Sequence, residues 1–143
     1  MKFEFSAGGI VYKKENGKIF VLIAKHSQYH GWVFPKGLIG DKEEFKGQSK
    51  EETALREVKE ETGVEGKIVR DLTPFSYWYV FEGEKRRKTV YYFLMEFVSG
   101  DITEHDMEME EVEWLLESEV EARLTFESEK RVWKEAEKII ENS

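Results

Sequence analysis

Three glutamates, Glu57, Glu60 and Glu61, are the residues of this chain whose spacing points most directly to chemistry. They stand at i, i+3 and i+4 within SKEETALREVKEETGV, so on a helix their carboxylates project from one flank within a single turn. One interpretation is a solvated acidic face, relieved by neighbouring basic residues. The other is a site for a hard divalent cation, because Mg²⁺ and Mn²⁺ prefer carboxylate oxygens and keep water or phosphate on their other positions.

Both ends of this stretch carry signals that bound a helix. Ser49 is a good N-cap, and Glu52, three residues on, can complete a capping box with it. Gly63 closes the other end, because a residue without a Cβ atom readily adopts the left-handed conformation that ends helices. The sequence therefore predicts one helix that holds the three carboxylates.

The same stretch resembles the signature of Nudix hydrolases: a glycine, five residues, a glutamate, seven residues, then Arg-Glu-aliphatic-x-Glu-Glu-x-Gly-aliphatic. The second half is present as REVKEETGV, from Arg56 to Val64, and FPKG places Gly37 at the first glycine. Gln48 stands where the family has the earlier glutamate. Since the spacing from Gly37 to Arg56 is five residues too long, we place an insertion within residues 40–46.

The resemblance implies one α/β domain over residues 1–143, an α/β/α sandwich with a mixed β-sheet, and a loop-helix-loop motif at residues 37–64. It also implies Mg²⁺, replaceable by Mn²⁺, bound through four oxygen ligands: Glu57, Glu60, Glu61 and the Gly37 carbonyl. Arg56 is then expected to brace the loop through Gln48, whose neutral amide makes a weaker hydrogen bond than a carboxylate. These groups would catalyse hydrolysis of a nucleoside diphosphate linked to another moiety.

Two aromatic segments supply candidates for substrate contact. In YWY, Tyr77 and Tyr79 share one face of a strand, where they either belong to the core or stack on a base. KTVYYFL resembles a segment of the dinucleoside polyphosphate hydrolases, which implies that Lys88 and Tyr92 face the phosphate chain. Lys36 would help to position the phosphates. The basic loop at residues 82–88 could instead be a solvated hairpin tip.

The remaining segments carry weaker signals. Paired glycines in FEFSAGGIVY indicate a bulge or a close backbone approach, and Asn16-Gly17 predicts a hairpin turn. His26 and His30 are expected in a solvated loop rather than against a substrate. The terminal helix expected over residues 126–140 faces the core and receives no chemical role.

The acidic linker expected over residues 101–113 supplies one more candidate for the site. The family resemblance implies that one glutamate of this linker, ahead of the strand with Trp114, approaches the metal as a ligand or general base. Glu108 fits that position best and Glu110 second.

Composition excludes several other classes of function. The net charge of −8 argues against broad nucleic-acid binding, which needs a basic face. The chain has no cysteine, which excludes disulfides, thiolate metal sites and a cysteine nucleophile. Its longest apolar run, Ile19 to Ala24, is too short to span a bilayer, and no signal peptide is evident. We expect a cytoplasmic monomer or homodimer that acts on a small nucleotide.

The flanking segments together are most similar to asymmetrical diadenosine tetraphosphate hydrolases, which implies ATP and AMP as products. Three alternatives stay open. Diphosphoinositol polyphosphate hydrolases share FPKG but should need a more basic surface, and nucleoside triphosphate pyrophosphatases share the motif. A nucleotide-binding sensor without catalysis is suggested by Gln48 and the insertion, although a pure binder has less need of three mutually repelling carboxylates.

Overall fold

The computed structural model describes residues 1–40 and 43–143. Its sheet has a central path of five strands in the order β3-β2-β1-β7-β5, to which β8 adds beside β2, β4 beside β1 and β6 beside β7. The strands are β1 (Lys2–Glu15), β2 (Lys18–His26), β3 (Trp32–Val33), β4 (Lys36–Leu38), β5 (Val64–Asp71), β6 (Phe75–Phe81), β7 (Glu84–Gly100) and β8 (Met109–Leu116). The helices are α1 (Lys50–Thr62), α2 (Glu117–Arg123) and α3 (Glu127–Glu141), with 3₁₀ turns η1 (Glu43–Phe45) and η2 (Ile102–Glu104).

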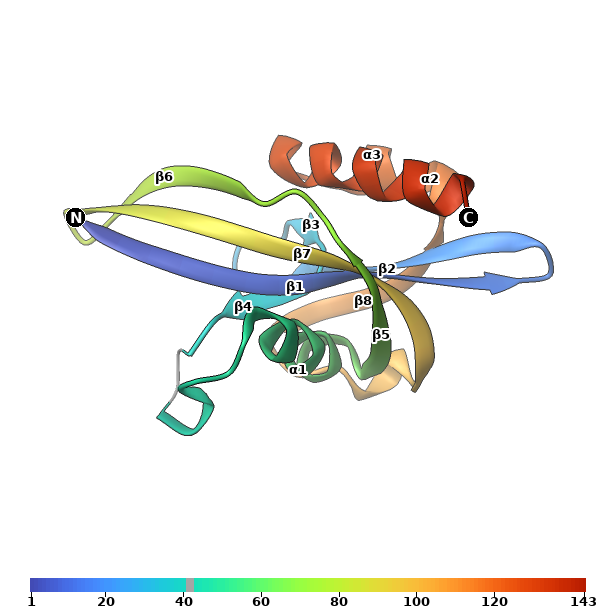
Figure 1. The fold of residues 1–143 in the computed structure, drawn as a ribbon, viewed down its shortest axis with the longest axis horizontal. Coiled ribbons are helices and arrows are strands. Elements are labelled where there is room, and N and C mark those ends of the chain that lie inside the picture. Colours follow the sequence, from blue (N-terminus) through green and yellow to red (C-terminus); the bar gives the residue numbers. More distant parts are fainter. Residues whose placement is uncertain (41–42) are drawn as a thin grey trace.

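The sheet is mixed and lies between two helical layers, which confirms the predicted α/β/α sandwich. β1 runs parallel to β7, whereas the other strand pairs are antiparallel. Figure 1 shows α1 on one face of the sheet and α2 and α3 on the other. One core cluster contains Val132, Trp133 and Ala136 of α3, and the other contains Ala54 and Val58 of α1, so each lies under one helical layer.

Helix α1 begins and ends where its capping residues predict. The Ser49 hydroxyl accepts the Glu52 N–H at 3.0 Å, and the Glu52 carboxylate accepts the Ser49 N–H at 3.1 Å. Gly63 takes the left-handed conformation with φ 79° and donates its N–H to the Lys59 carbonyl. Ala54 and Val58 are fully buried against the sheet, and Glu57 and Glu61 are buried beside them, so the docking of the helix also fixes these two carboxylates.

The paired glycines mark a close backbone approach and not a bulge. β1 continues through Gly8 and Gly9, and a Cβ atom on Gly8 would lie 2.1 Å from the Pro35 carbonyl oxygen. Gly9 donates its N–H to that same oxygen at 3.1 Å. This contact holds the segment that leads into Gly37 against β1.

The β1–β2 and β6–β7 hairpins each turn at two residues with positive φ, which matches the right-handed twist of antiparallel strands. Asn16 (φ 53°) and Gly17 (φ 77°) form the predicted turn between β1 and β2. Glu82 (φ 51°) and Gly83 (φ 76°) form the turn between β6 and β7. The prediction of a basic loop over residues 82–88 is therefore wrong, because the basic residues lie on β7 itself.

Helix α3 packs on the sheet as expected, with Val132, Trp133, Ala136 and Ile140 buried. Phe126 precedes the helix and is 43% exposed, so its assignment to the core was wrong. In the described part of the chain, no helix has the length and apolar character to cross a membrane.

Candidate active site

A cleft of about 400 Å³ at one end of α1 brings the motif glutamates together with residues from distant parts of the chain. Gly37 and Lys36 reach it from β4, Lys88 from β7, and Glu108 from the segment ahead of β8. The charged residues that line it, all predicted except Asp106, are Lys36, Glu57, Glu60, Glu61, Lys88, Asp106 and Glu108.

Glu57 packs directly on Gly37. A Cβ atom on Gly37 would lie 2.1 Å from Glu57 Oε2, so no residue larger than glycine fits there without movement. Glu57 is only 6% exposed, and its Oε1 accepts Arg56 Nη1 at 2.9 Å. The glycine of the motif therefore allows a buried carboxylate to lie against the backbone of β4.

Arg56 braces the loop ahead of α1, as predicted. Its Nε donates to Gln48 Oε1 at 3.0 Å, and its Nη1 also lies 3.1 Å from Glu60 Oε2. The Phe45 ring lies under the guanidinium, with 3.7 Å from Cζ to the ring centroid, in a cation–π contact. Phe45 belongs to the predicted insertion at residues 40–46, of which residues 41–42 lie outside the described chain.

The environment of Glu61 strongly perturbs its ionisation. It is 3% exposed, and its Oε1 accepts the backbone N–H of Lys36 at 3.1 Å. Burial, reinforced by the charges of Glu57 and Glu108, raises its pKa to about 10. The three carboxylates thus create an unfavourable concentration of negative charge that a bound cation would relieve.

The donor chemistry of the cleft fits a hard divalent cation. Its walls carry the carboxylates of Glu57, Glu60, Glu61, Asp106 and Glu108, and such an ion prefers oxygen ligands to sulfur. Within residues 1–40 and 43–143, however, no three His, Asp or Glu side chains are already grouped as a cation site. Arg56 engages Glu57 and Glu60, while the Lys36 N–H engages Glu61, so a cation would compete with these donors.

Two lysines supply positive charge to the cleft that holds the glutamates. Lys36 and Lys88 line this cleft and also a second, adjoining cavity of about 340 Å³. Burial, together with the nearby Lys36 charge, lowers the pKa of Lys88. Lys88 and Lys36 therefore lie at the boundary between the two cavities.

The second cavity is lined largely by aromatic rings. Tyr77 lies there with Phe75, Phe126 and Tyr29, so the predicted stacking position is available for this tyrosine. Tyr79 shares the face of β6 but lies outside both cavities, where its hydroxyl donates to Glu4. The position of Tyr79 therefore does not support the predicted contact between Tyr79 and the substrate.

The prediction that Tyr92 faces the phosphate chain is wrong. Tyr92 is 1% exposed and belongs to the core under α3, where its hydroxyl donates to the Glu129 carboxylate. It shares a face of β7 with Lys88, but α3 covers the strand at Tyr92 and leaves Lys88 at the cavity boundary.

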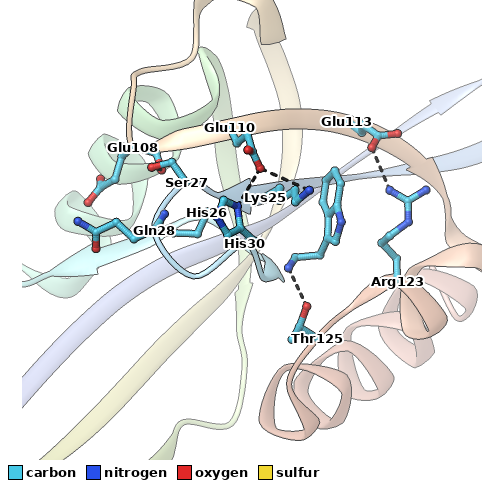
Figure 2. A network of polar contacts seen from close by, with 11 residues as sticks. Lys25, His26, Ser27, Gln28, His30, Glu108, Glu110, Glu113, Arg123 and Thr125 are labelled. Carbon is cyan, nitrogen blue, oxygen red and sulfur yellow. Dashed lines mark hydrogen bonds and ion pairs between the residues drawn. The ribbon is translucent and has the colours of Figure 1, made fainter.

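The segment before β8 is anchored to the loop after β2. Ser27 donates from its N–H at 3.0 Å and from its hydroxyl at 2.9 Å to the Glu108 carbonyl, which leaves the Glu108 side chain at the cleft. Figure 2 shows Glu110 turned away, toward Lys25 and His30, at 3.4 and 3.2 Å. β8 begins at Met109, earlier than the linker prediction allowed, so Glu110 lies on the strand, whereas Glu108 lies in the segment ahead of it.

His26 lies in the cleft, contrary to the expectation of a solvated residue. It stacks on Tyr29 with ring centroids 4.2 Å apart, and burial lowers its pKa. His30 is exposed, as expected. Tyr29 touches both cavities and packs edge-on against Phe126; no motif in the sequence signalled either aromatic residue.

Comparisons with known proteins agree with this architecture. A family model described as NUDIX domain matches residues 2–139. The mutator protein MutT4 of Mycobacterium tuberculosis is 35% identical over 144 residues, which cover 96% of this chain and 56% of MutT4. The asymmetrical bis(5'-nucleosyl)-tetraphosphatase of Rattus norvegicus is 34% identical over 94 residues, covering 65% of this chain and 60% of the rat protein. The matched part of the chain thus spans less than two thirds of the length of either relative.

Solved structures share the fold at low sequence identity. An Ap4A hydrolase of C. elegans, in a binary complex, superimposes with a TM-score of 0.67 at 18% identity, covering 98% of this chain and 99% of that one. The NUDIX domain of Shewanella oneidensis NrtR, complexed with ADP ribose, gives a TM-score of 0.73 at 17% identity, covering 98% and 89%.

Proposed function

The chain belongs to the Nudix family, and on that premise we propose that it is a divalent-metal-dependent pyrophosphohydrolase of nucleotides. We propose diadenosine tetraphosphate, cleaved to ATP and AMP, as its preferred substrate. The observation that carries this proposal is the pair of adjoining cavities, one acidic and one aromatic, which share Tyr29, Lys36 and Lys88. Such a pair suits a polyphosphate chain that ends in a purine nucleoside.

The acidic cleft would bind the phosphates together with Mg²⁺. The residues that would hold the ion are Glu57, Glu60, Glu61 and the Gly37 carbonyl. Bound there, Mg²⁺ supplies a water of lowered pKa and neutralises phosphate charge. Glu108, which lines the same cleft, is the candidate to accept a proton from the attacking water.

The lysines would orient the phosphate chain, and the aromatic cavity would hold a base. Lys36 and Lys88 lie where a chain of phosphates would pass from one cavity to the other. Tyr77 is available for stacking on a purine, a contact worth about 1–3 kcal/mol. Arg56, joined to Gln48, Glu57 and Glu60, would fix the motif loop without touching the reacting atoms.

Two alternatives are less well supported. A diphosphoinositol phosphate carries far more charge than two lysines in an acidic cleft can balance. A sensor without catalysis was suggested by Gln48, but Gln48 makes its hydrogen bond to Arg56, and three glutamates of the motif line the cleft. A cytoplasmic location and a monomeric or homodimeric state complete the proposal.

The test is incubation of the pure protein with diadenosine tetraphosphate, ADP-ribose, deoxynucleoside triphosphates and a diphosphoinositol phosphate, each with Mg²⁺ or with EDTA. We expect chromatography to show ATP and AMP, formed only with metal. Faster turnover of another compound would move the substrate and keep the chemistry. Nucleotide binding without any turnover would refute the enzyme.

A further inference from the structure

Glu129, at the start of α3, is a buried carboxylate to which the proposed chemistry assigns no role. It is 3% exposed and lies on the opposite side of the sheet from the motif helix. Burial of a carboxylate is costly unless its oxygens are hydrogen-bonded or paired with a positive charge. The contacts that compensate Glu129 therefore indicate what this residue does.

The side-chain hydrogen bonds and the ion pair of Glu129 lead to the segment that enters the cleft, either directly or through Tyr92. Its Oε1 accepts the backbone N–H of Phe34 at 2.9 Å. Its Oε2 accepts the Tyr92 hydroxyl, which also donates to the Phe34 carbonyl at 3.3 Å. The same Oε2 lies 3.9 Å from Lys36 Nζ, in an ion pair whose side chains are 18% and 3% exposed.

Lys36 is thus held at both ends by glutamates from opposite helical layers. Its ammonium is paired with Glu129 of α3, and its backbone N–H donates to Glu61 of α1 at 3.1 Å. Its side chain forms part of the wall common to both cavities. A single lysine therefore connects α3, the phosphate cleft and the motif helix.

We propose that Glu129 is a positioning residue that holds the Lys36 ammonium at the boundary of the two cavities, ready for the phosphate chain. This inference rests on the proposed pyrophosphohydrolase activity. Glu129 also lines the aromatic cavity, but it is only 3% exposed and its carboxylate oxygens are engaged by Phe34, Tyr92 and Lys36, so the inferred role is exerted through that lysine. Its loss should change how phosphates are oriented more than how tightly they are bound.

The test is a double-mutant cycle on Glu129→Gln and Lys36→Met, with kcat and KM measured for each variant. Glutamine keeps an acceptor for the Phe34 N–H but removes the charge that pairs with Lys36. We expect Glu129→Gln to lower kcat about tenfold, because the Lys36 ammonium is no longer held in place. KM should stay unchanged or fall, because a negative charge near the phosphates is lost. In the Lys36→Met background the same change should lower kcat less than twofold.

A purely structural role would give a different pattern. Destabilised protein loses kcat in both backgrounds, so additive losses would overturn the inference, as would an unchanged kcat for Glu129→Gln alone. Glu127→Gln is the matched control, because it removes the same charge from an 86% exposed side chain on the same helix. We expect it to leave kcat and KM as in the wild type.

A second variant covers the case in which Glu129→Gln does not fold. Tyr92→Phe keeps the ring in the core and removes one hydrogen bond to Glu129. We expect a severalfold loss of kcat that disappears when Lys36 is methionine, and a loss that persists would contradict the inference. If the wild-type protein shows no metal-dependent turnover, both the proposed function and the positioning role of Glu129 are overturned. If the wild type is active but the losses of kcat in the double-mutant cycle are additive, only the positioning role is overturned.

Discussion

Replacing Gly37 with alanine should separate the role of the cleft from the stability of the fold. The new Cβ would lie 2.1 Å from Glu57 Oε2 and 2.2 Å from its carboxyl carbon, whereas ordinary contact is 3.4–4 Å. Glu57 cannot yield freely, because it is 6% exposed and held by Arg56 Nη1 at 2.9 Å. Either the carboxylate or β4 must therefore move by about 1 Å in a closely packed site.

A displacement of that size has consequences for rate and for stability. Misplacement by about 1 Å costs on the order of 100-fold in turnover. Overpacking in a buried site costs about 1–3 kcal/mol in the free energy of unfolding. We therefore expect Gly37→Ala to remain folded at 25 °C and to lose about 100-fold in kcat.

The assay is metal-dependent release of ATP and AMP, measured beside urea unfolding of the same preparations. Gly17→Ala is the matched control: no atom lies within 4 Å of its new Cβ, but its φ of 77° strains alanine by about 1–2 kcal/mol. This control should lose stability and keep its kcat. Wild-type turnover by Gly37→Ala would refute the packing of Glu57 on Gly37 as a requirement for activity.

The other predictions concern the motif helix and the tyrosines of β6. Glu61→Gln should remove nearly all turnover, and a wild-type rate would rule Glu61 out as a metal ligand. Because burial raises the pKa of Glu61 to about 10, metal binding at pH 8 should release about one proton, measurable by calorimetry in buffers of different ionisation enthalpy. For the same reason, metal-free protein should lose stability as pH rises from 4.5 toward 10, and Glu61→Gln should lack that loss. Gln48→Glu should give Arg56 a charge-assisted partner and keep or raise kcat; a large loss would mean that the insertion is misplaced. Tyr77→Ala should raise KM for a purine nucleotide about 10- to 100-fold, whereas Tyr79→Ala should change KM less than twofold; equal effects would argue against the aromatic cavity as the base site.

The parts of the site that could be predicted depend on local sequence. The capping box at Ser49, the left-handed Gly63 and the Asn16-Gly17 turn each involve residues a few positions apart. A local pattern of this kind specifies its own geometry, since the hydrogen bonds close within one or two turns. The motif helix and its carboxylate flank were for that reason placed correctly.

The errors concern residues whose environment depends on a distant element. Alternation correctly puts Lys88 and Tyr92 on one face of β7, but only the docking of α3 decides that Tyr92 is covered. Likewise, Tyr79 shares a face with Tyr77 and falls beyond the cavity. Glu129 carried no signal at all, because its partners are far from it in sequence.

The parallel pairing of β1 with β7 has a consequence for how this molecule is made. The register joins Lys2 to Arg86 and Tyr12 to Glu96, so the centre of the sheet depends on contacts across more than half of the chain. Long-range parallel pairing of this kind slows folding, because loop-closure entropy is lost before the contacts form. During synthesis, β1 cannot pair with β7 until β7 emerges from the ribosome, and its early partners are β2 and β4. The catalytic cleft, which joins the β4 segment to β1 and Lys88 to β7, is therefore among the last parts of the nascent protein to assemble.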